Sequence, residues 1–319
     1  MLEGGLRHRA QGASMRAVRA HDRDAPVDSL VAEEAPYPYA GEGDVVVKVR
    51  AACFTPGELT WPASWVDRAG RPRSPVVPGH EVSGEVAEVA LGTTGLSVGQ
   101  RVIGLTDWNR DGTLAEYVAV EARNLTPLPA DVDPVRAAAL PMPGLTAWQG
   151  LFVHGRLRTG QSVLVHGAGG GVGMAATQLA RDAGARVLGS GRAKSRDLVL
   201  ELGAEEFVDL EQPAWEEAVG LVDLVFDAVG GTVLDRSAAV LRAGGALISI
   251  SRPPTVRPED GLAMYFIVEP DRSHLAQVVD RHRQGRLRPL VGSVRPLAEA
   301  PDALRTKSGT AGKTVIAVE

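Results

Sequence analysis

One nine-residue stretch decides the fold class, and it reads Val165-His166-Gly167-Ala168-Gly169-Gly170-Gly171-Val172-Gly173. It follows a short apolar run, 162–166, that is typical of a buried strand, and it opens a segment of small helix-forming residues, 171–183. A glycine loop at such a place lets the backbone turn tightly and approach a pyrophosphate, whose charge is favoured by free N–H groups at the helix N-terminus. The stretch predicts a dinucleotide-binding βαβ unit. The alternative is a glycine-rich turn that binds nothing.

The glycine spacing assigns separate roles within this loop. Gly167 and Gly170 are expected at the turn and at the close approach to the pyrophosphate, and Gly173 is expected where helix and strand pack closely. The pattern is Gly-x-x-Gly-x-x-Gly, not the Gly-x-Gly-x-x-Gly of many NAD enzymes, because position 172 is Val. The remaining candidate cofactor-binding residues of the loop are Ala168, Gly169, Gly171 and Val172.

The rhythm of strands and helices changes along the chain. From residue 15 to about 124 the apolar residues form short β-rich runs such as 45–49, 82–86, 101–104 and 114–118, separated by Gly and Pro. After about residue 131, strand, glycine turn and helix alternate, which predicts an α/β domain with a doubly wound parallel sheet. The last alternating run, 313–318, is a strand that the β-rich domain can use to close its sheet.

The residues after the second predicted strand of the α/β domain select the coenzyme. NAD-preferring domains end this strand with Asp or Glu, which would repel a 2′-phosphate, but Ser190 stands here. Arg192, Lys194 and Arg196 follow within reach of that phosphate, and guanidinium groups suit phosphate well. NADP(H) is therefore predicted. Lys194 and Arg196 are alternatively solvated charges at the start of a helix, although a positive charge there is unfavourable for the helix dipole.

Composition excludes several function classes. A chain of 319 residues suits two domains, and its net charge of -5 gives no field to hold nucleic acid. Cys53 is the only cysteine, so neither an intrachain disulfide nor a cysteine-cluster metal site can form. No apolar run resembles a signal peptide or a membrane span. A cytoplasmic protein without a membrane partner is expected, with residues 1–14 as a disordered extension.

Further motifs give the chain a family resemblance. It resembles the medium-chain dehydrogenase/reductase superfamily, specifically the zinc-independent quinone oxidoreductase branch with its zeta-crystallin-like NADPH quinone reductases. Besides the glycine loop, the motifs that carry the resemblance lie at 78–84, 98–102, 112–118, 143–148 and 312–315. The resemblance implies a GroES-like, mainly-β substrate domain at 15–130 and 263–319, a Rossmann domain at 131–262, a cleft between them, and a homodimer.

The resemblance also implies site residues. It places Thr55, a candidate catalytic residue, and Thr146 near the nicotinamide, although each threonine can instead have a local turn or helix-cap role. Val229 and Gly230 would line the cofactor after a strand of the Rossmann sheet. Ser249 and Lys313 complete the expected cofactor-binding residues.

Zinc separates this chain from the alcohol dehydrogenases that it resembles. The positions of their three catalytic zinc ligands fall on Thr55, on His80 and near Met142, which is not a donor set that zinc prefers. No metal is therefore predicted. His80 is then either a polar, catalytic side chain of the cleft or a hydrogen-bonded packing residue.

Without a Lewis acid, reduction of an electron-poor acceptor is easier than oxidation of an alcohol. We therefore expect hydride transfer from NADPH to a small-molecule electrophilic acceptor, a quinone or an α,β-unsaturated carbonyl. The resemblance places four candidate substrate-binding residues in loops that form the family's substrate pocket: Trp61, Trp65, Asp107 and Trp108. Packing between loops is the alternative. No side chain is a clear proton donor, and water can protonate the product. Two other functions stay open: a ketone or alcohol dehydrogenase of a biosynthetic pathway, and a non-catalytic NADPH-binding sensor.

Overall fold

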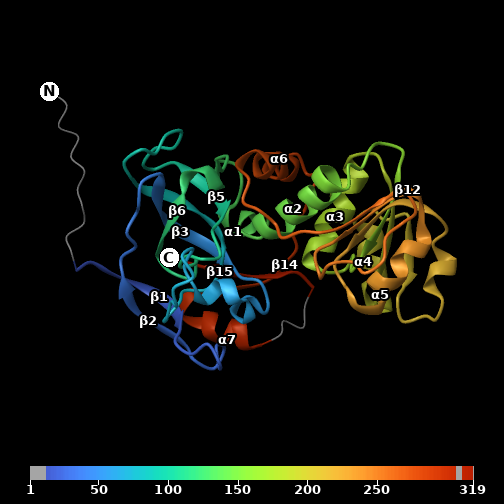
Figure 1. The fold of residues 1–319 in the computed structure, drawn as a ribbon. Coiled ribbons are helices and arrows are strands. Elements are labelled where there is room, and N and C mark those ends of the chain that lie inside the picture. Colours follow the sequence, from blue (N-terminus) through green and yellow to red (C-terminus); the bar gives the residue numbers. More distant parts are fainter. Residues whose placement is uncertain (1–11, 307–310, 319) are drawn as a thin grey trace.

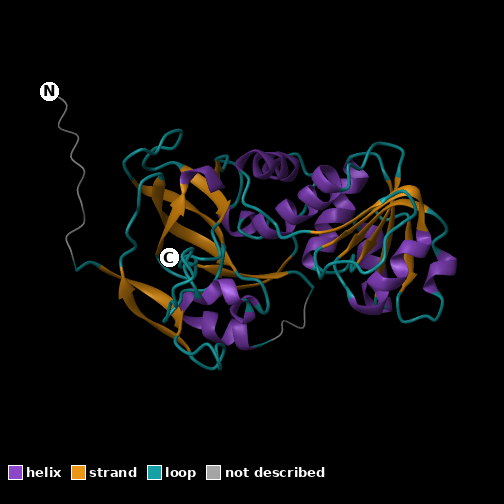
Figure 2. Cartoon of the chain, viewed as in Figure 1, coloured by secondary structure: helices purple, strands orange, loops and turns teal. Residues whose placement is uncertain are grey.

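The computed structural model describes residues 12–306 and 311–318, which form two units built around separate sheets. Figure 1 shows the units side by side, with α2 (Pro141–Trp148) and α6 (Arg272–Arg283) lying between them. The helices are concentrated on one unit and the other is mainly β (Figure 2). This is the expected combination of a GroES-like unit and a Rossmann unit.

The first unit is organised around the long strand β3. The sheet order is β14-β15-β3-β4-β5-β7, and β6 pairs with the first half of β3. Val45, Val46 and Val47 of β3 are fully buried, because β3 has neighbours on both sides. The strands of this unit are β1 (Ser14–Ala20), β2 (Leu30–Pro36), β3 (Asp44–Cys53), β4 (Glu81–Val89), β5 (Arg101–Leu105), β6 (Tyr117–Glu121), β7 (Leu125–Pro127), β14 (Val291–Pro296) and β15 (Lys313–Ala317).

The second unit is a six-stranded sheet in the order β10-β9-β8-β11-β12-β13 with every pair parallel. Chain order runs outward from β8 in both directions, so a topological switch point lies between β8 and β11, where such sheets bind ligands. Its strands are β8 (Ser162–His166), β9 (Arg186–Gly191), β10 (Glu206–Asp209), β11 (Val222–Asp227), β12 (Leu241–Ser249) and β13 (Leu262–Tyr265).

The helices connect and cover these sheets. The π-helical turn 149–154 continues α2, and α3 packs against both α2 and β9. The remaining helices of the described chain are α1 (Pro134–Ala137), α3 (Gly171–Asp182), α4 (Arg196–Glu201), α5 (Gly231–Arg236) and α7 (Ala300–Arg305). Within the described residues, no helix combines the length and the apolar character needed to span a bilayer.

Some expected boundaries differ from the observed ones. The strand expected at 114–118 begins only at Tyr117, because Leu114 instead bonds to β1 through the N–H of Val18 at 2.8 Å. The expected domain boundary at residue 263 falls inside β13, which pairs in parallel with β12. The expected extension lies outside the described residues up to residue 11, and β1 begins at Ser14.

Candidate cofactor and active site

The glycine loop joins β8 to α3 at the switch point. Gly167 has a φ of 75°, which favours glycine, and a Cβ at Gly173 would lie 2.1 Å from the carbonyl oxygen of Gly167. Gly173 is thus required by close packing of the loop on the helix. A Cβ at Gly171 would have no neighbour closer than 3.9 Å, and both Gly170 and Gly171 are exposed. Bare backbone at the N-terminus of α3 therefore faces open space, and this arrangement fits the pyrophosphate of a dinucleotide.

The loop after β11 lies against the glycine loop. A Cβ at Gly167 would be 3.1 Å from Cγ2 of Val229, which is 45% exposed although it is apolar. Asp227, fully buried at the end of β11, accepts the N–H groups of Val229 and Gly230 at 3.1 and 3.0 Å. One carboxylate therefore fixes the two residues expected to line the cofactor.

Ser249 belongs to the same buried cluster. Its hydroxyl donates to Asp227 at 2.8 Å, and Ser251 donates to the same carboxylate at 2.9 Å. Because Ser249 is fully buried, its side chain supports Asp227 and does not face a cofactor. The cofactor contact expected of the Ser249 side chain is therefore not supported.

Ser190 is also occupied within the protein. His166 and Ser190 are direct neighbours on the parallel strands β8 and β9, and Nδ1 of the imidazole lies 2.6 Å from the serine Oγ. The hydroxyl of Ser237 lies 3.0 Å from Nε2, and burial lowers the pKa of His166 to about 4, so the ring is neutral. Both His166 and Ser190 are fully buried. The expected contact of Ser190 with a 2′-phosphate is thus corrected: the residue is small and uncharged at this position, but its hydroxyl points inward.

The cations that follow β9 have a different environment. Arg192, Lys194 and Arg196 are all exposed. The guanidinium of Arg196 lies 5.9 Å from the ring centroid of Phe207. In the described chain, neither Arg192 nor Lys194 has an ion-pair partner, whereas many other arginines do. These two cations are available to a ligand at the end of β9.

The expected catalytic residues, Thr55 and His80, lie beside the adjoining ends of two inner strands of the first sheet. Cys53, the last residue of β3, pairs with Glu81, the first residue of β4, so Thr55 and His80 follow and precede neighbouring strands. Glu58 ties the two loops together, because its carboxylate accepts the N–H of Thr55 at 2.7 Å and that of Gly79 at 2.5 Å. Glu58 is buried, and burial raises the pKa of its carboxyl to about 7.

His80 is enclosed between polar and aromatic neighbours. Its Nδ1 lies 3.0 Å from Oγ1 of Thr106, and its ring meets Trp108 edge-on at a centroid distance of 4.6 Å. Trp61 in turn contacts Trp108 edge-on at 5.3 Å. Burial, followed by the charge of Arg73, lowers the pKa of His80 to about 3, so the imidazole is neutral at physiological pH.

Lys313 begins β15 and lies beside the same ends of β3 and β4. Its ammonium pairs with the buried carboxylate of Glu81, whose other oxygen accepts the N–H of Met142 at 2.9 Å. Burial raises the pKa of Glu81, and Lys313 opposes this effect. Lys313 also lines a narrow cavity together with Pro143 and Gly171 of the other unit. Lys313 and Gly171 of the glycine loop therefore line the same narrow gap between the units.

Thr146 and Met142 lie within α2. The hydroxyl of Thr146 donates to the carbonyl of Met142 at 2.6 Å and is buried, which agrees with the local helical role. The three positions expected for zinc ligands thus carry a threonine, a histidine bonded to Thr106 and a methionine. Among the described residues, no group of three or more His, Cys, Asp or Glu side chains is placed to hold a metal ion. These residues do not fit a catalytic zinc.

The expected substrate residues divide into two kinds. Trp65 is 3% exposed, belongs to the core of the first unit, and donates its indole N–H to the carbonyl of Leu59 at 2.8 Å. It is a packing residue, which was the alternative. Asp107 and Trp108 instead line a cleft of about 680 Å³ that is bounded on the other side by residues 269–273, where the chain enters α6.

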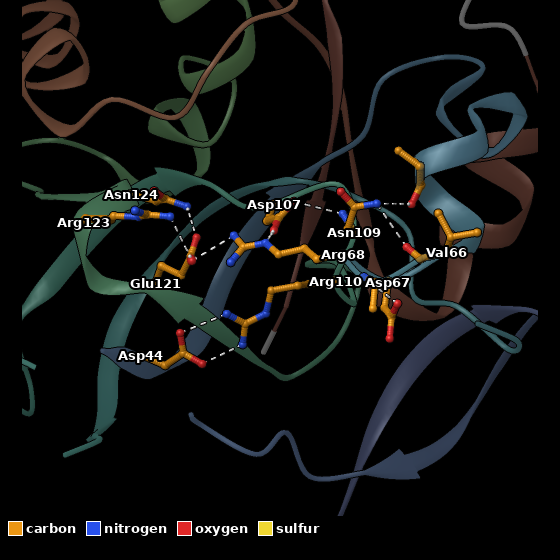
Figure 3. A network of polar contacts seen from close by, with 12 residues as sticks. Asp44, Val66, Asp67, Arg68, Asp107, Asn109, Arg110, Glu121, Arg123 and Asn124 are labelled. Atoms are coloured by element: carbon orange, nitrogen blue, oxygen red, sulfur yellow. Dashed lines mark hydrogen bonds and ion pairs between the residues drawn. The ribbon is translucent and has the colours of Figure 1, made fainter. Parts of the chain in front are cut away.

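Several charged side chains that line this cleft belong to one network of polar contacts (Figure 3). Arg68 bridges Asp107 at 2.6 Å and Glu121 at 2.8 Å. The amide of Asn109 donates to the carbonyls of Ala63 and Val66 at 3.3 and 3.2 Å, which ties the loop of Trp108 to the loop of Trp61. Asp107 therefore positions the wall of the cleft.

Two family models match the chain. The alcohol dehydrogenase GroES-like domain model matches residues 41–130, and the zinc-binding dehydrogenase model matches residues 202–316. Quinone oxidoreductase from Lama guanicoe is 29% identical over 324 aligned positions, which cover 95% of this chain and 97% of the relative. The solved structure of quinone oxidoreductase from Coxiella burnetii has a TM-score of 0.84 at 25% identity and covers 96% of this chain and 100% of that one. An NAD-dependent alcohol dehydrogenase has a TM-score of 0.81 at 26% identity, with the same coverage.

The fold and these matches together define a two-domain oxidoreductase with a GroES-like and a Rossmann unit. The chain belongs to the medium-chain dehydrogenase/reductase superfamily, in its quinone oxidoreductase branch. The expected resemblance and fold class are confirmed. A Rossmann unit in this family indicates a nicotinamide cofactor.

Three residues that the sequence reasoning did not single out organise the site: Glu58, Thr106 and Asp227. Asp227 carried a signal, because an acidic residue directly follows the apolar run Leu224-Val225-Phe226 and stands three residues before Gly230. The sequence around Glu58 and Thr106 carried no such signal, because the pairing of strands β3, β4 and β5 brings these residues to their hydrogen-bond partners.

Proposed function

We propose that this protein is an NADPH-dependent reductase that transfers a hydride to a quinone or an α,β-unsaturated carbonyl without zinc. The observation that carries the coenzyme preference is the end of β9. Arg192 and Lys194 are exposed there without an ion-pair partner in the described chain, and no carboxylate stands at position 190. A 2′-phosphate would gain charge-assisted hydrogen bonds at this place.

Zinc independence is supported by the donor set. A catalytic zinc needs three protein ligands with nitrogen, thiolate or carboxylate donors. Thr55, His80 and Met142 offer one such donor, and the Nδ1 of His80 is already bonded to Thr106. An acceptor that is activated by its own conjugation suits such a site better than an alcohol does.

When bound, the reduced nicotinamide would supply a hydride to the conjugated carbon of the acceptor. The chain's residues bind and orient the reactants. Trp61 and Trp108 form an aromatic wall for a planar acceptor, and Val229 offers an apolar surface beside the glycine loop. The negative charge that arrives with the hydride spreads over the conjugated acceptor, and water supplies the proton to its oxygen. Positioning thus supplies most of the catalysis.

Steady-state kinetics on protein treated with a chelator test this function. We expect oxidation of NADPH with quinones and with enones, and weaker use of NADH. A strict requirement for added zinc, or activity with simple ketones but with neither quinones nor enones, would contradict the proposal and favour a ketone or alcohol dehydrogenase.

A homodimer is also part of the proposal. Strand β13 is the edge of the Rossmann sheet, and Leu262, Tyr265 and Ile267 in and just after it are 42%, 36% and 64% exposed. Exposed apolar edge strands commonly pair with another chain. Light scattering should give twice the chain mass of 33.5 kDa. Ile267→Glu should shift the mass toward the monomer, whereas Val98→Glu, an exposed position on the other unit, should not. A monomeric wild-type protein would contradict this.

A further inference from the structure

The imidazole of His80 has one hydrogen bond within the described chain, between Nδ1 and Oγ1 of Thr106. The two residues are also linked through the backbone, because the N–H of Thr106 donates to the carbonyl of His80 at 2.7 Å. Strand pairing enforces this link, since Glu81 opposite Leu105 places His80 and Thr106 side by side. The contact with Trp108 holds the plane of the ring.

The other ring nitrogen, Nε2, has no hydrogen-bond partner in the part of the chain that is described. The His80 residue is 3% exposed. Among the described residues, a side-chain nitrogen or oxygen atom that is fully enclosed and has no hydrogen-bond partner occurs in Arg73, Thr177 and His274, but not in His80. Nε2 therefore keeps contact with accessible space. Trp108, which contacts this ring, also lines the candidate acceptor cleft.

The hydrogen bond between His80 and Thr106 is best satisfied by one tautomer of the neutral His80 ring. Thr106 is 2% exposed, and the contact with His80 is the only hydrogen bond of its hydroxyl among the described residues. If Nδ1 carried the proton, the hydroxyl would accept it and its own O–H would be left buried without an acceptor, which costs about 1–3 kcal/mol. If Thr106 donates to Nδ1, every enclosed group is satisfied and the ring proton is on Nε2.

We propose that Thr106 holds His80 in the Nε2-protonated neutral form and that this N–H donates a hydrogen bond to the carbonyl oxygen of the acceptor. This inference rests on the proposed function and gives it an electrophilic group. Hydride addition forms a C–H bond at the conjugated carbon and moves an electron pair onto the oxygen, where the His80 N–H stabilises the charge. His80 keeps its proton, and water protonates the oxygen. His80 is then the catalytic residue, and Thr106 is a positioning residue.

Nitrogen NMR of the full chain labelled with ¹⁵N-histidine measures the tautomer without any turnover. The signals of His80 are assigned by their loss in His80→Gln. We expect a neutral ring protonated at Nε2 in the wild type and a mixed population in Thr106→Val, which removes the hydroxyl at nearly constant volume. A wild-type ring protonated at Nδ1, or a cationic ring near neutral pH, would overturn the inference.

Kinetics separate the donor from a packing role. Loss of one donor to a developing oxyanion lowers kcat by about 10²–10³-fold, and we expect this for His80→Leu. His80→Gln, whose amide N–H can take the place of Nε2–H, should recover most of that loss, and Thr106→Val should lie between them. KM for NADPH should stay unchanged in all three. Folded His80→Leu protein with wild-type kcat would overturn the inference, whereas absence of NADPH oxidation by the wild type would overturn the proposed function itself.

Discussion

The carboxylate of Glu58 accepts the backbone N–H of Gly79 at 2.5 Å across a separation of 21 residues. Its second oxygen accepts the N–H of Thr55 at 2.7 Å. One buried acid therefore joins the loop after β3 to the loop before β4, and these loops carry Thr55 and His80. Both bonds join a backbone N–H to the Glu58 carboxylate, so the side chains of Thr55 and His80 take no part in holding the two loops together.

Burial of Glu58 makes stability depend on pH. Its pKa is raised from 4.5 to about 7, chiefly by desolvation, so the folded protein binds more protons than the unfolded chain between these values. The stabilising contribution of the protonated carboxyl is present below pH 4.5 and is lost as pH rises through about 7, by on the order of 3 kcal/mol in all. Urea unfolding at several pH values should show this loss in the wild type and not in Glu58→Gln. Parallel stability curves for the two proteins would contradict the assignment.

Two glycines of the loop should respond differently to a methyl group. Gly171→Ala has room in the fold, so the apo Tm should stay equal or rise slightly, because alanine favours the first turn of α3. The added methyl should nevertheless occupy the surface offered to the pyrophosphate and weaken NADPH binding about tenfold or more. Gly173→Ala brings its Cβ within 2.1 Å of a backbone oxygen and should lower stability by about 1–3 kcal/mol. Calorimetry and thermal melts check both; unchanged NADPH affinity in Gly171→Ala argues against this binding surface.

Arg192 should carry much of the preference for NADPH. Loss of a hydrogen bond to a charged group costs about 1.5–3 kcal/mol, which corresponds to roughly 10–100-fold in affinity. Arg192→Glu should therefore bind NADPH at least tenfold more weakly and bind NADH as well as before. Arg23→Glu, at an exposed position of the first unit, is the matched control. Equal losses for both coenzymes would show that Arg192 does not contact the 2′-phosphate.

Trp61 and Trp65 are four residues apart but should behave differently. Trp65→Ala removes a core side chain and should cost about 3–5 kcal/mol of stability. Trp61 is only half-buried and contacts Trp108, so Trp61→Ala should leave the Tm nearly unchanged and raise KM for the quinone several-fold. Thermal melts and quinone titrations at saturating NADPH measure both effects. A Trp61→Ala variant with wild-type KM would remove this residue from the acceptor site.

The glycine loop and the order of units could be predicted from sequence because their signals are local. Strand, turn and helix follow one another within the stretch 162–183, and the turn needs glycine at defined places. Ser190 shows where local reasoning stops. Its partner is His166, 24 residues earlier, and only the parallel register of β8 and β9 brings the two side chains together.

The two tryptophans show a second limit. Two short 3₁₀ helices, 58–60 and 62–65, make up most of this segment. Such short helices show no repeating pattern of apolar residues from which the buried Trp65 could be told apart from the half-buried Trp61. The clamp of Glu58 and the pair of His80 and Thr106 depend likewise on the neighbours of β4 in the sheet. Long-range pairing, not composition, decides these contacts.

The central claim is tested most directly by mixing the purified, chelator-treated protein with NADPH and a quinone and following the near-ultraviolet absorbance of the coenzyme. We predict oxidation of NADPH that needs no added metal, is faster than oxidation of NADH, and is strongly reduced in Gly171→Ala. Protein that is folded by thermal melt and yet neither binds nor oxidises either coenzyme would contradict the claim.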